Sequence, residues 1–338
     1  MTKIIKTLAL GSGGLRGIYH LSVLEVFEDL NLIKDITKYA GCSIGSLICV
    51  LYIVSYTPKE MLELFNQFTI NDMFEINAKN ILQFPKTYGI ESGTKYGNYI
   101  KDCLSKKDCN PYITLGEFYQ KYNKHLVITV TNISDRKLEV FDHISAPDIP
   151  VWIAIKMSCA VPFVFQPVEH LGKLYVDGAV IGDLPLGLTD NPDETVIFNL
   201  QDNIEPTDIY TYVCSLIRCV QHESYNYAID NYPKSCFFFD LSYTDFMTDD
   251  KKSIDSIKTS HLFENNKVKI KELMVNHLKE EVEKEEEVEK EEEVEKEEEV
   301  EKEEEVEAIN PIINNTITIN DNENENDNEN ENENENES

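Results

Sequence analysis

The feature that most constrains the fold of this chain is a pair of glycine-containing turns, each lying between two apolar segments. The first turn, residues 11–17, follows the apolar run 4–10. The second turn, residues 41–45, lies between the short apolar run 36–40 and the apolar segment 46–54. Glycine permits dihedral angles and close backbone approaches that other residues do not, so each pattern predicts a strand that turns sharply into a helix.

An alternation of strands and helices continues along the chain. Residues 59–122 should be mainly helical, with a loop around 84–93. Strands are expected at 4–10, 36–40, 125–132, 137–141, 173–176 and 195–200, and helices at 19–30, 43–56 and 150–160. This order predicts an α/β fold in which both faces of the sheet are covered.

The composition changes sharply at residue 280. Residues 280–307 contain 19 Glu and 4 Lys, and residues 321–338 contain 9 acidic residues and no basic one. These stretches carry −15 and −9 of the total charge of −31, which leaves −7 for residues 1–279. Such a charge is ordinary for a domain that buries a full core. We therefore expect a globular part followed by an acidic low-complexity tail at 280–338.

The tail itself has two kinds of repeat. Residues 282–306 repeat Val-Glu-Lys-Glu-Glu-Glu with a period of six, which turns successive valines by about 240° around a helix and forms no apolar seam. Glu and Lys four residues apart favour a solvated single helix, which the like charges oppose, and the Asn/Glu alternation after residue 320 is typical of disorder. A surface this acidic argues against nucleic acid as a partner. The sequence identifies no protein partner for the tail.

Cysteine spacing and apolar run lengths indicate the compartment. The eight cysteines have neither the spacing of a zinc site nor that of a redox clip, and no acidic segment has the pattern of a calcium loop. The apolar residues before Gly11 are too few for a secretory signal, and segment 44–54 is too short to span a bilayer. We expect a cytoplasmic protein with reduced thiols, no bound metal, and at most transient peripheral contact with membranes.

The second turn has the pattern G-x-S-x-G, formed by Gly41, Ser43 and Gly45. The flanking glycines remove the Cβ atoms that would clash in a tight strand-to-helix turn. The amino terminus of the following helix stabilises negative charge that develops on the serine oxygen or on an attacked carbonyl. Ser43 is therefore a candidate nucleophile. The alternative is a buried serine in a turn that only packs.

The first turn matches neither of the common phosphate-binding patterns. Gly11 and Gly13 fit the dinucleotide fingerprint, but Arg16 occupies the position of its third glycine, and a phosphate loop would need lysine where the chain has Gly17. What remains is a run of backbone N–H groups that can face an anion, with Arg16 nearby. These are the requirements of an oxyanion hole. The alternative is a turn that only packs a strand on a helix.

A serine nucleophile needs a base. None of the seven histidines lies in a recognisable motif, so the sequence does not assemble a Ser-His-Asp triad. Asp177 ends an expected strand on the turn Asp177-Gly178-Ala179, at a sheet edge of the kind where α/β folds bind ligands. An aspartate with a pKa of about 4 is a weak base, so this role requires burial that raises its pKa.

Taken in order, the three motifs resemble those of the patatin-like phospholipases. That family carries G-G-G-x-R/K-G, then G-x-S-x-G, then D-G-A/G. This chain has Ser12-Gly13-Gly14-Leu15-Arg16-Gly17, the turn at 41–45, and Asp177-Gly178-Ala179. Residues 89–93, 157–162 and 184–185 are also similar to the family. Three positions differ from its usual pattern: Ser12 for the first glycine, Cys159 for Ser, and Asp183 for Asn.

The resemblance implies a three-layer α/β/α fold and a lipid acyl hydrolase that uses a Ser-Asp dyad without histidine. Ser43 would be the nucleophile and Asp177 the general base. The oxyanion donors would be Gly13, Gly14 and Leu15, and the supporting motif residues Ser12, Arg16, Gly17, Gly41, Gly45, Gly178 and Ala179. It implies a lipid substrate at a membrane or micelle surface, and no calcium or other cofactor. The catalytic domain would occupy 5–190, and residues 191–279 would complete the same globular domain.

Two other classes stay open. A Ser-His-Asp esterase of another α/β type also uses a G-x-S-x-G turn, and a non-catalytic binding or storage protein can keep the same fold. The sequence specifies neither the head group and acyl position of the lipid nor the oligomeric state.

Overall fold

The computed structural model describes residues 4–67, 78–182, 191–201, 212–213, 215–222, 226, 236–240 and 254–279. Contacts divide the chain into one unit of residues 2–278 and a second unit made of Met1 and residues 279–338. The acidic tail, Asp183 and residues 184–185 lie outside the described residues. What the sequence predicts for them stays a prediction.

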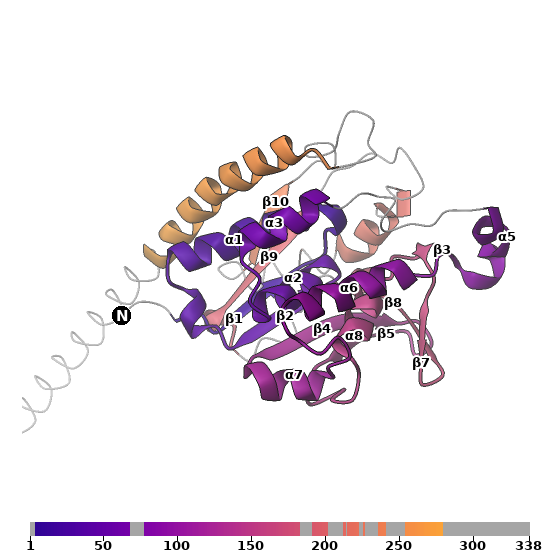
Figure 1. Ribbon diagram of the computed structural model, residues 1–338. Helices are drawn as coiled ribbons and strands as arrows, with labels where there is room; N and C mark the ends of the chain where they lie inside the picture. Colours follow the sequence, from indigo (N-terminus) through magenta and orange to yellow (C-terminus); the bar gives the residue numbers. More distant parts are fainter. Residues whose placement is uncertain are drawn as a thin grey trace, which may run out of the picture. The chain divides into compact units, whose positions relative to one another are not determined.

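Within the described residues, eight strands form one mixed sheet (Figure 1). Five neighbours in it are parallel, in the order β10 (Cys236–Asp240), β9 (Thr195–Gln201), β1 (Thr7–Leu10), β2 (Lys38–Cys42) and β4 (His125–Asn132). Three further strands pair in the antiparallel sense: β8 (Lys173–Asp177) and β5 (Lys137–Phe141) with β4, and β7 (Val168–His170) with β8. A separate parallel pair is formed by β3 (Gly89–Glu91) and β6 (Phe163–Phe165).

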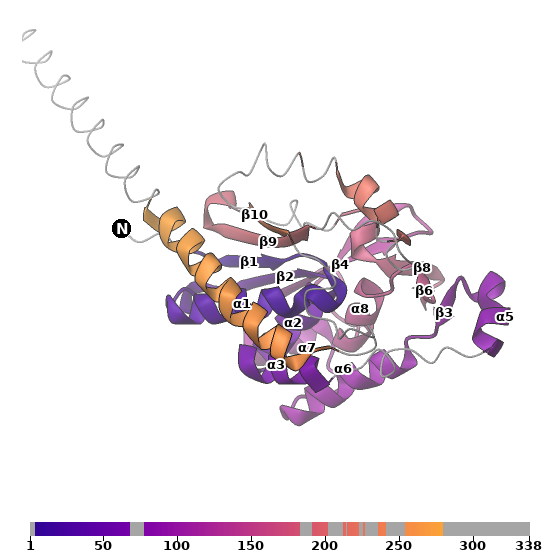
Figure 2. The same cartoon turned by 90° about the horizontal axis from the view of Figure 1, so that it is seen from above.

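Helices connect these strands. They are α1 (Ile18–Asp29), α2 (Ile44–Ile53), α3 (Pro58–Gln67), α5 (Ala78–Thr87), α6 (Thr94–Lys106), α7 (Leu115–Tyr122) and α8 (Val151–Ser158). Figure 2 shows α1, α2, α3 and α6 together on one side of the sheet. A further helix, residues 256–279, packs against α1, where the Ser22 hydroxyl donates to the Phe263 carbonyl at 3.2 Å. No helix in the described stretches is long and apolar enough to cross a bilayer.

Both faces of the sheet are buried. Alternate residues of β1 point to opposite faces, so Leu8 and Leu10 join the large core beneath the helices. Ala9 joins a second, smaller buried cluster with Ala40, Val127 and Ile197. This arrangement confirms the α/β prediction, and the small side chains of the second cluster suit a sheet face that is closely covered.

The structure differs from the sequence prediction mainly in short elements. Gly41 and Cys42 belong to β2 rather than to the turn, so α2 begins directly after Ser43. The expected loop at 84–93 contains the end of α5 and the strand β3. The strands β3, β6 and β7 have three residues each, too few to show a periodic apolar pattern.

Candidate active site

The ends of β2 and β8 meet beside β4. On one edge of β4, β5 pairs with residues 128–132. On the other edge β2 pairs with residues 125–129, and β8, which runs in the opposite direction, pairs with residues 130–132. Cys42 therefore lies opposite Thr129, and Asp177 lies opposite the next residue, Val130. This register brings Ser43, which follows β2, next to the last residue of β8.

Ser43 and Asp177 are hydrogen-bonded to each other. The Ser43 hydroxyl donates to Asp177 Oδ2 at 2.7 Å, and both side chains are buried. The other carboxylate oxygen, Oδ1, accepts the N–H of Ala179 at 2.9 Å, and the N–H of Asp177 donates to the Ala160 carbonyl at 2.9 Å. The carboxylate is thus oriented by its own turn and lies within proton-transfer distance of the hydroxyl.

The backbone of Ser43 is in a sparsely populated conformation, with φ 53° and ψ −124°. Such strain persists only where the surrounding structure holds it. The hydroxyl of Ser158 accepts the N–H of Ser43 at 2.8 Å and donates to the Thr129 carbonyl at 2.8 Å. Ser158 therefore ties the serine turn to β4. The family resemblance includes residues 157–162, but the sequence does not predict this role, because it does not show which strand Ser158 contacts.

Gly45 brings the two glycine turns together. A Cβ atom added at Gly45 would lie 2.2 Å from the Leu10 carbonyl oxygen and 2.7 Å from that of Gly11. Only glycine therefore lets the first turn of α2 contact the end of β1. This contact places the turn at residues 11–17 beside Ser43.

The first turn forms a short 3₁₀ helix, Gly14–Gly17, which follows Gly13. The N–H and the Nε of Arg16 both donate to the Gly13 carbonyl at 3.1 Å, so the arginine closes the turn on itself. The first amides of a helical turn have no acceptor within it. The N–H groups of Gly14 and Leu15 are therefore suited to an anion, as the oxyanion prediction requires.

Cys159 lies next to the dyad. The Tyr96 hydroxyl donates to its Sγ at 3.2 Å. Burial raises the pKa of Cys159 to about 12, and the charge of Asp177 acts in the same direction. Because the thiolate is the reactive form of cysteine, the Cys159 thiol is unreactive at neutral pH.

All seven histidines lie in the described part of the chain, and none of them hydrogen-bonds to Ser43. His20 Nε2 is bonded to the Gly11 carbonyl at 2.9 Å, and His125 Nε2 to Asp142 Oδ2 at 2.8 Å. His143 stacks on Tyr119, with ring centroids 3.7 Å apart. The side-chain partner of the Ser43 hydroxyl in the described structure is therefore an aspartate and not a histidine.

One cluster outside the dyad has the residue types of a metal site. Donor atoms of His125, Asp142 and His143 lie within 4.8 Å of one another, at the amino-terminal end of β4. Burial alone would raise the pKa of Asp142, but hydrogen bonds from Ser145, His125 and Ile144 outweigh it and lower the pKa to about 2. These partners satisfy the Asp142 carboxylate, which forms a histidine-carboxylate pair with His125.

The fold and the serine turn together define an α/β protein with a buried serine at a strand-to-helix turn, and sequence comparison supplies its family. The family model for patatin-like phospholipase matches residues 8–190. The chain therefore belongs to the patatin-like phospholipase family, which confirms the resemblance found in the three motifs.

Two relatives, one from a virus and one from a fungus, illustrate the similarity. The chain is 29% identical over 192 residues to a probable lipid hydrolase of Invertebrate iridescent virus 6, covering 55% of this chain and 63% of the relative. It is 25% identical over 210 residues to triacylglycerol lipase 5 of Saccharomyces cerevisiae, covering 53% of this chain and 27% of the lipase. The chain thus spans less than two thirds of the length of these two relatives.

A solved structure supports the fold. VipD from Legionella pneumophila superposes with a TM-score of 0.53 and 15% identity, covering 81% of this chain and 67% of that one. At that identity the likeness concerns the fold alone.

Proposed function

We propose that this protein is a lipid acyl hydrolase that cleaves fatty-acyl ester bonds through an acyl-enzyme on Ser43, with Asp177 as the general base. The observation that carries the proposal is the buried 2.7 Å hydrogen bond between Ser43 Oγ and Asp177 Oδ2 at a strained strand-to-helix turn. The names of the iridescent virus and yeast relatives, a probable lipid hydrolase and a triacylglycerol lipase, support the substrate class.

The reaction has two balanced steps. Asp177 takes the Ser43 proton as Oγ attacks the ester carbonyl, and the resulting oxyanion accepts hydrogen bonds from the amides of Gly13, Gly14 and Leu15. The leaving alcohol takes the proton from Asp177 and departs. Water then attacks the acyl-enzyme while Asp177 accepts its proton, and Ser43 regains a proton as the fatty acid leaves.

Two alternatives differ in measurable ways. A Ser-His-Asp esterase would lose activity when one histidine is replaced, whereas a dyad tolerates each histidine replacement that leaves the fold intact. A binding or storage protein would not react with a fluorophosphonate at Ser43. The absence of a hydrogen bond between Ser43 and any of the seven histidines favours the dyad.

The test uses the purified full chain and a soluble monomeric ester. Ser43→Ala and Asp177→Asn should each abolish hydrolysis and keep the circular dichroism spectrum. Ser105→Ala and Asp135→Asn are matched controls on exposed positions and should keep wild-type turnover. Residual turnover in Asp177→Asn together with a dead histidine variant would move the function to a triad esterase.

The substrate is proposed to be a phospholipid, a lysophospholipid or a neutral lipid, met at a membrane or micelle surface by a cytoplasmic protein. Mass spectrometry of lipid mixtures before and after incubation would identify which acyl ester is lost. Equal lipid composition with wild-type protein and Ser43→Ala would reject all three substrates.

A further inference from the structure

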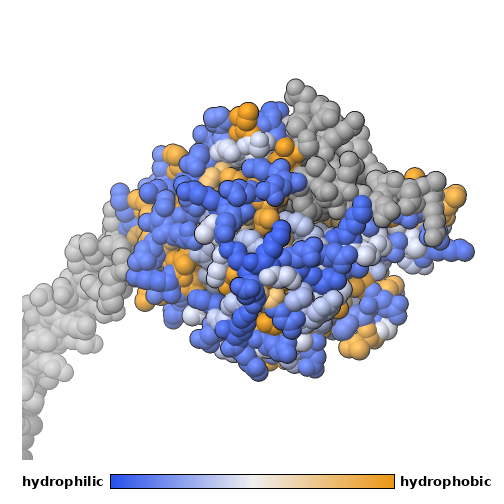
Figure 3. Space-filling model, viewed as in Figure 1, coloured by the Kyte–Doolittle hydropathy of each residue, from blue (hydrophilic) through white to orange (hydrophobic). Residues whose placement is uncertain are grey.

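An apolar patch lies at the end of the molecule formed by α5 and β6. Ile81 and Leu82 of α5 are 55% and 81% exposed, and Tyr88 and Phe163 are 60% and 47% exposed. Phe84 lies beside Phe163, with ring centroids 6.3 Å apart. In Figure 1, α5 projects from the right-hand end of the molecule, and Figure 3 shows hydrophobic and hydrophilic residues side by side there. These five side chains form what we call the α5–β6 patch.

The backbone keeps the two patch aromatics at the surface in an unfavourable conformation. Tyr88 and Phe163 have φ angles of 58° and 67°. Bulky residues rarely adopt positive φ, and such outliers persist where the surrounding structure fixes them. Tyr88 directly precedes β3 and Phe163 begins β6, and the pairing of Gly89 with Phe163 fixes both. The pairing of β3 with β6 therefore fixes the exposed positions of the two rings.

One residue of the patch, Phe163, is held near the dyad by a short stretch of chain. The Ala160 carbonyl accepts the N–H of Asp177, and Phe163 follows three residues later. Three residues span at most about 11 Å, so Phe163 cannot lie further than that from Ala160. A surface that binds the α5–β6 patch is thus held near Ser43 and Asp177.

The segment that carries most of the patch has a charge of opposite sign to that of the whole chain. Residues 78–95 contain Lys79, Lys86 and Lys95 and a single acidic residue, Glu91, which is buried. The whole chain carries −31. An exposed apolar helix face flanked by lysines is the composition that binds the interface of an anionic bilayer.

From these observations we infer that the α5–β6 patch docks the protein on the anionic surface of a phospholipid aggregate, next to the catalytic dyad. The inference rests on the proposed function, since docking at this patch delivers lipid esters to Ser43. Ile81, Leu82 and Phe163 enter the interfacial region, and Lys86 and Lys95 remain at the level of the phosphates. A protein partner is the other occupant that such a patch could accept, and it is an outcome of the test below.

The test measures cosedimentation of the full chain with vesicles of phosphatidylcholine alone and with about one third phosphatidylglycerol. The double variant Ile81→Gln/Leu82→Gln should bind both vesicle types roughly 100-fold more weakly, at about tenfold for each large aliphatic side chain. Lys86→Gln should bind anionic vesicles about fivefold more weakly and leave binding to neutral vesicles unchanged.

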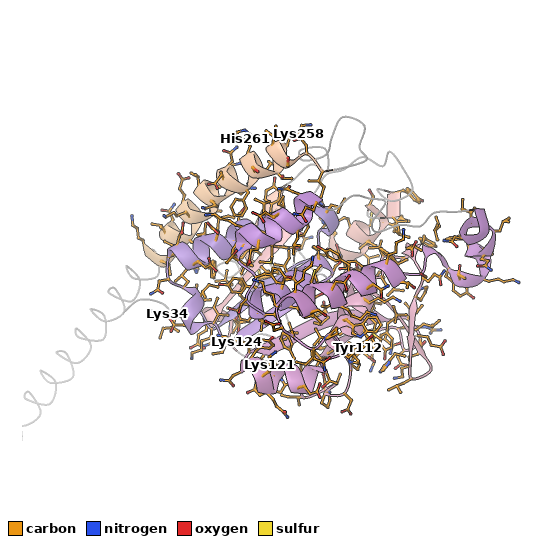
Figure 4. The ribbon with its side chains drawn as sticks, in the orientation of Figure 1. Lys34, Tyr112, Lys121, Lys124, Lys258 and His261 are labelled. Atoms are coloured by element: carbon orange, nitrogen blue, oxygen red, sulfur yellow. The ribbon has the colours of Figure 1, made fainter. Side chains whose placement is uncertain are left out.

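Two control variants match these changes elsewhere on the surface. Ile257→Gln removes a 71% exposed isoleucine from the helix that carries the labelled Lys258 and His261 in Figure 4. Lys34→Gln removes a lysine that precedes β2 and lies in Figure 4 at the end of the molecule opposite α5. Both controls should bind vesicles like the wild type.

Vesicle binding that is absent in the wild type, or equal in the patch and control variants, would overturn the inference and leave a protein partner as the occupant. Turnover of a soluble ester, measured in parallel, separates this inference from the proposed function. A chain that is inactive on every ester but loses vesicle binding with Ile81→Gln/Leu82→Gln would refute the enzyme and keep the docking surface. Loss of soluble-ester turnover in that double variant would count against docking, because the patch would then belong to the active site.

Discussion

The two ends of β4 each hold a buried or half-buried aspartate bonded to a polar partner, yet they suit different tasks. At the carboxyl end Asp177 accepts the hydroxyl of Ser43, whose backbone is strained and faces the first glycine turn. At the amino end the Asp142 carboxylate is hydrogen-bonded to His125 Nε2 and to the backbone N–H groups of Ile144 and Ser145. These hydrogen bonds lower the pKa of Asp142 to about 2. A carboxylate stabilised so strongly is a poor base. Both aspartates are buried, so what distinguishes the two sites is the partner: a serine hydroxyl on a strained turn for Asp177, and a histidine with two backbone N–H groups for Asp142.

The largest expected effect separates the two aspartates. Asp177→Asn should remove hydrolysis of a soluble ester, because the residues of a catalytic unit act together and the loss of one member removes most of the acceleration. Asp142→Asn should keep the wild-type kcat, since its partners lie at the other end of β4. Steady-state kinetics on both variants measures the two kcat values. An equal loss of kcat in both would show that the two aspartates do not differ in their role.

The next effect concerns the oxyanion turn. Leu15→Pro should lower kcat by about 100- to 1,000-fold, because it removes one amide donor. Gly14 is a poorer position for this test, since its φ of 57° cannot be adopted by proline and the turn itself would change. Leu15→Ala keeps the N–H and serves as the control. A folded Leu15→Pro variant with normal kcat would show that the oxyanion is stabilised elsewhere.

A smaller effect is expected from Ser158, which positions Ser43 without contacting substrate. Ser158→Ala should lower kcat by roughly 10- to 100-fold and leave KM unchanged, because a small displacement of the nucleophile is costly. Ser158→Thr retains the hydroxyl and should recover most of the rate. A change in KM alone, or no recovery with threonine, would mean that Ser158 acts only through packing.

The smallest effect is on stability. Asp142→Asn should lower the free energy of unfolding at pH 7 by about 1 kcal/mol, after allowance for the solvent that reaches this pair. The pKa of Asp142 is lower in the folded than in the unfolded chain, so its contribution is present above about pH 4 and is lost as the pH falls toward 2. Urea unfolding at several pH values measures it. A difference between wild type and variant that is as large at pH 2 as at pH 7 would contradict the assignment.

The sequence predicted the longer elements and the chemistry of each motif separately. The strands β4 and β5 have the predicted bounds because each is an alternating or continuous apolar run bounded by turn residues. The pairing of Ser43 with Asp177 came only from the family resemblance. Nothing in the local pattern shows that β8 approaches β4 from the opposite direction and ends where β2 ends.

The remaining features depend on contacts between distant segments. Gly45 is required by the carbonyl oxygens of Leu10 and Gly11, and Ser158 is fixed by Thr129. Each of these partners lies in another strand or directly after one, so periodicity and residue type do not reveal them. The α5–β6 patch was missed for a related reason, because an exposed apolar side chain and a buried one look the same in a sequence.

The most direct test of the dyad is the site and rate of covalent labelling by a fluorophosphonate, read by mass spectrometry of peptides. The wild type and Asp142→Asn should gain one adduct on the peptide that contains Ser43, at equal rates, and Asp177→Asn should react far more slowly. Labelling of a different residue, or an unchanged labelling rate in Asp177→Asn, would contradict a Ser43 nucleophile activated by Asp177.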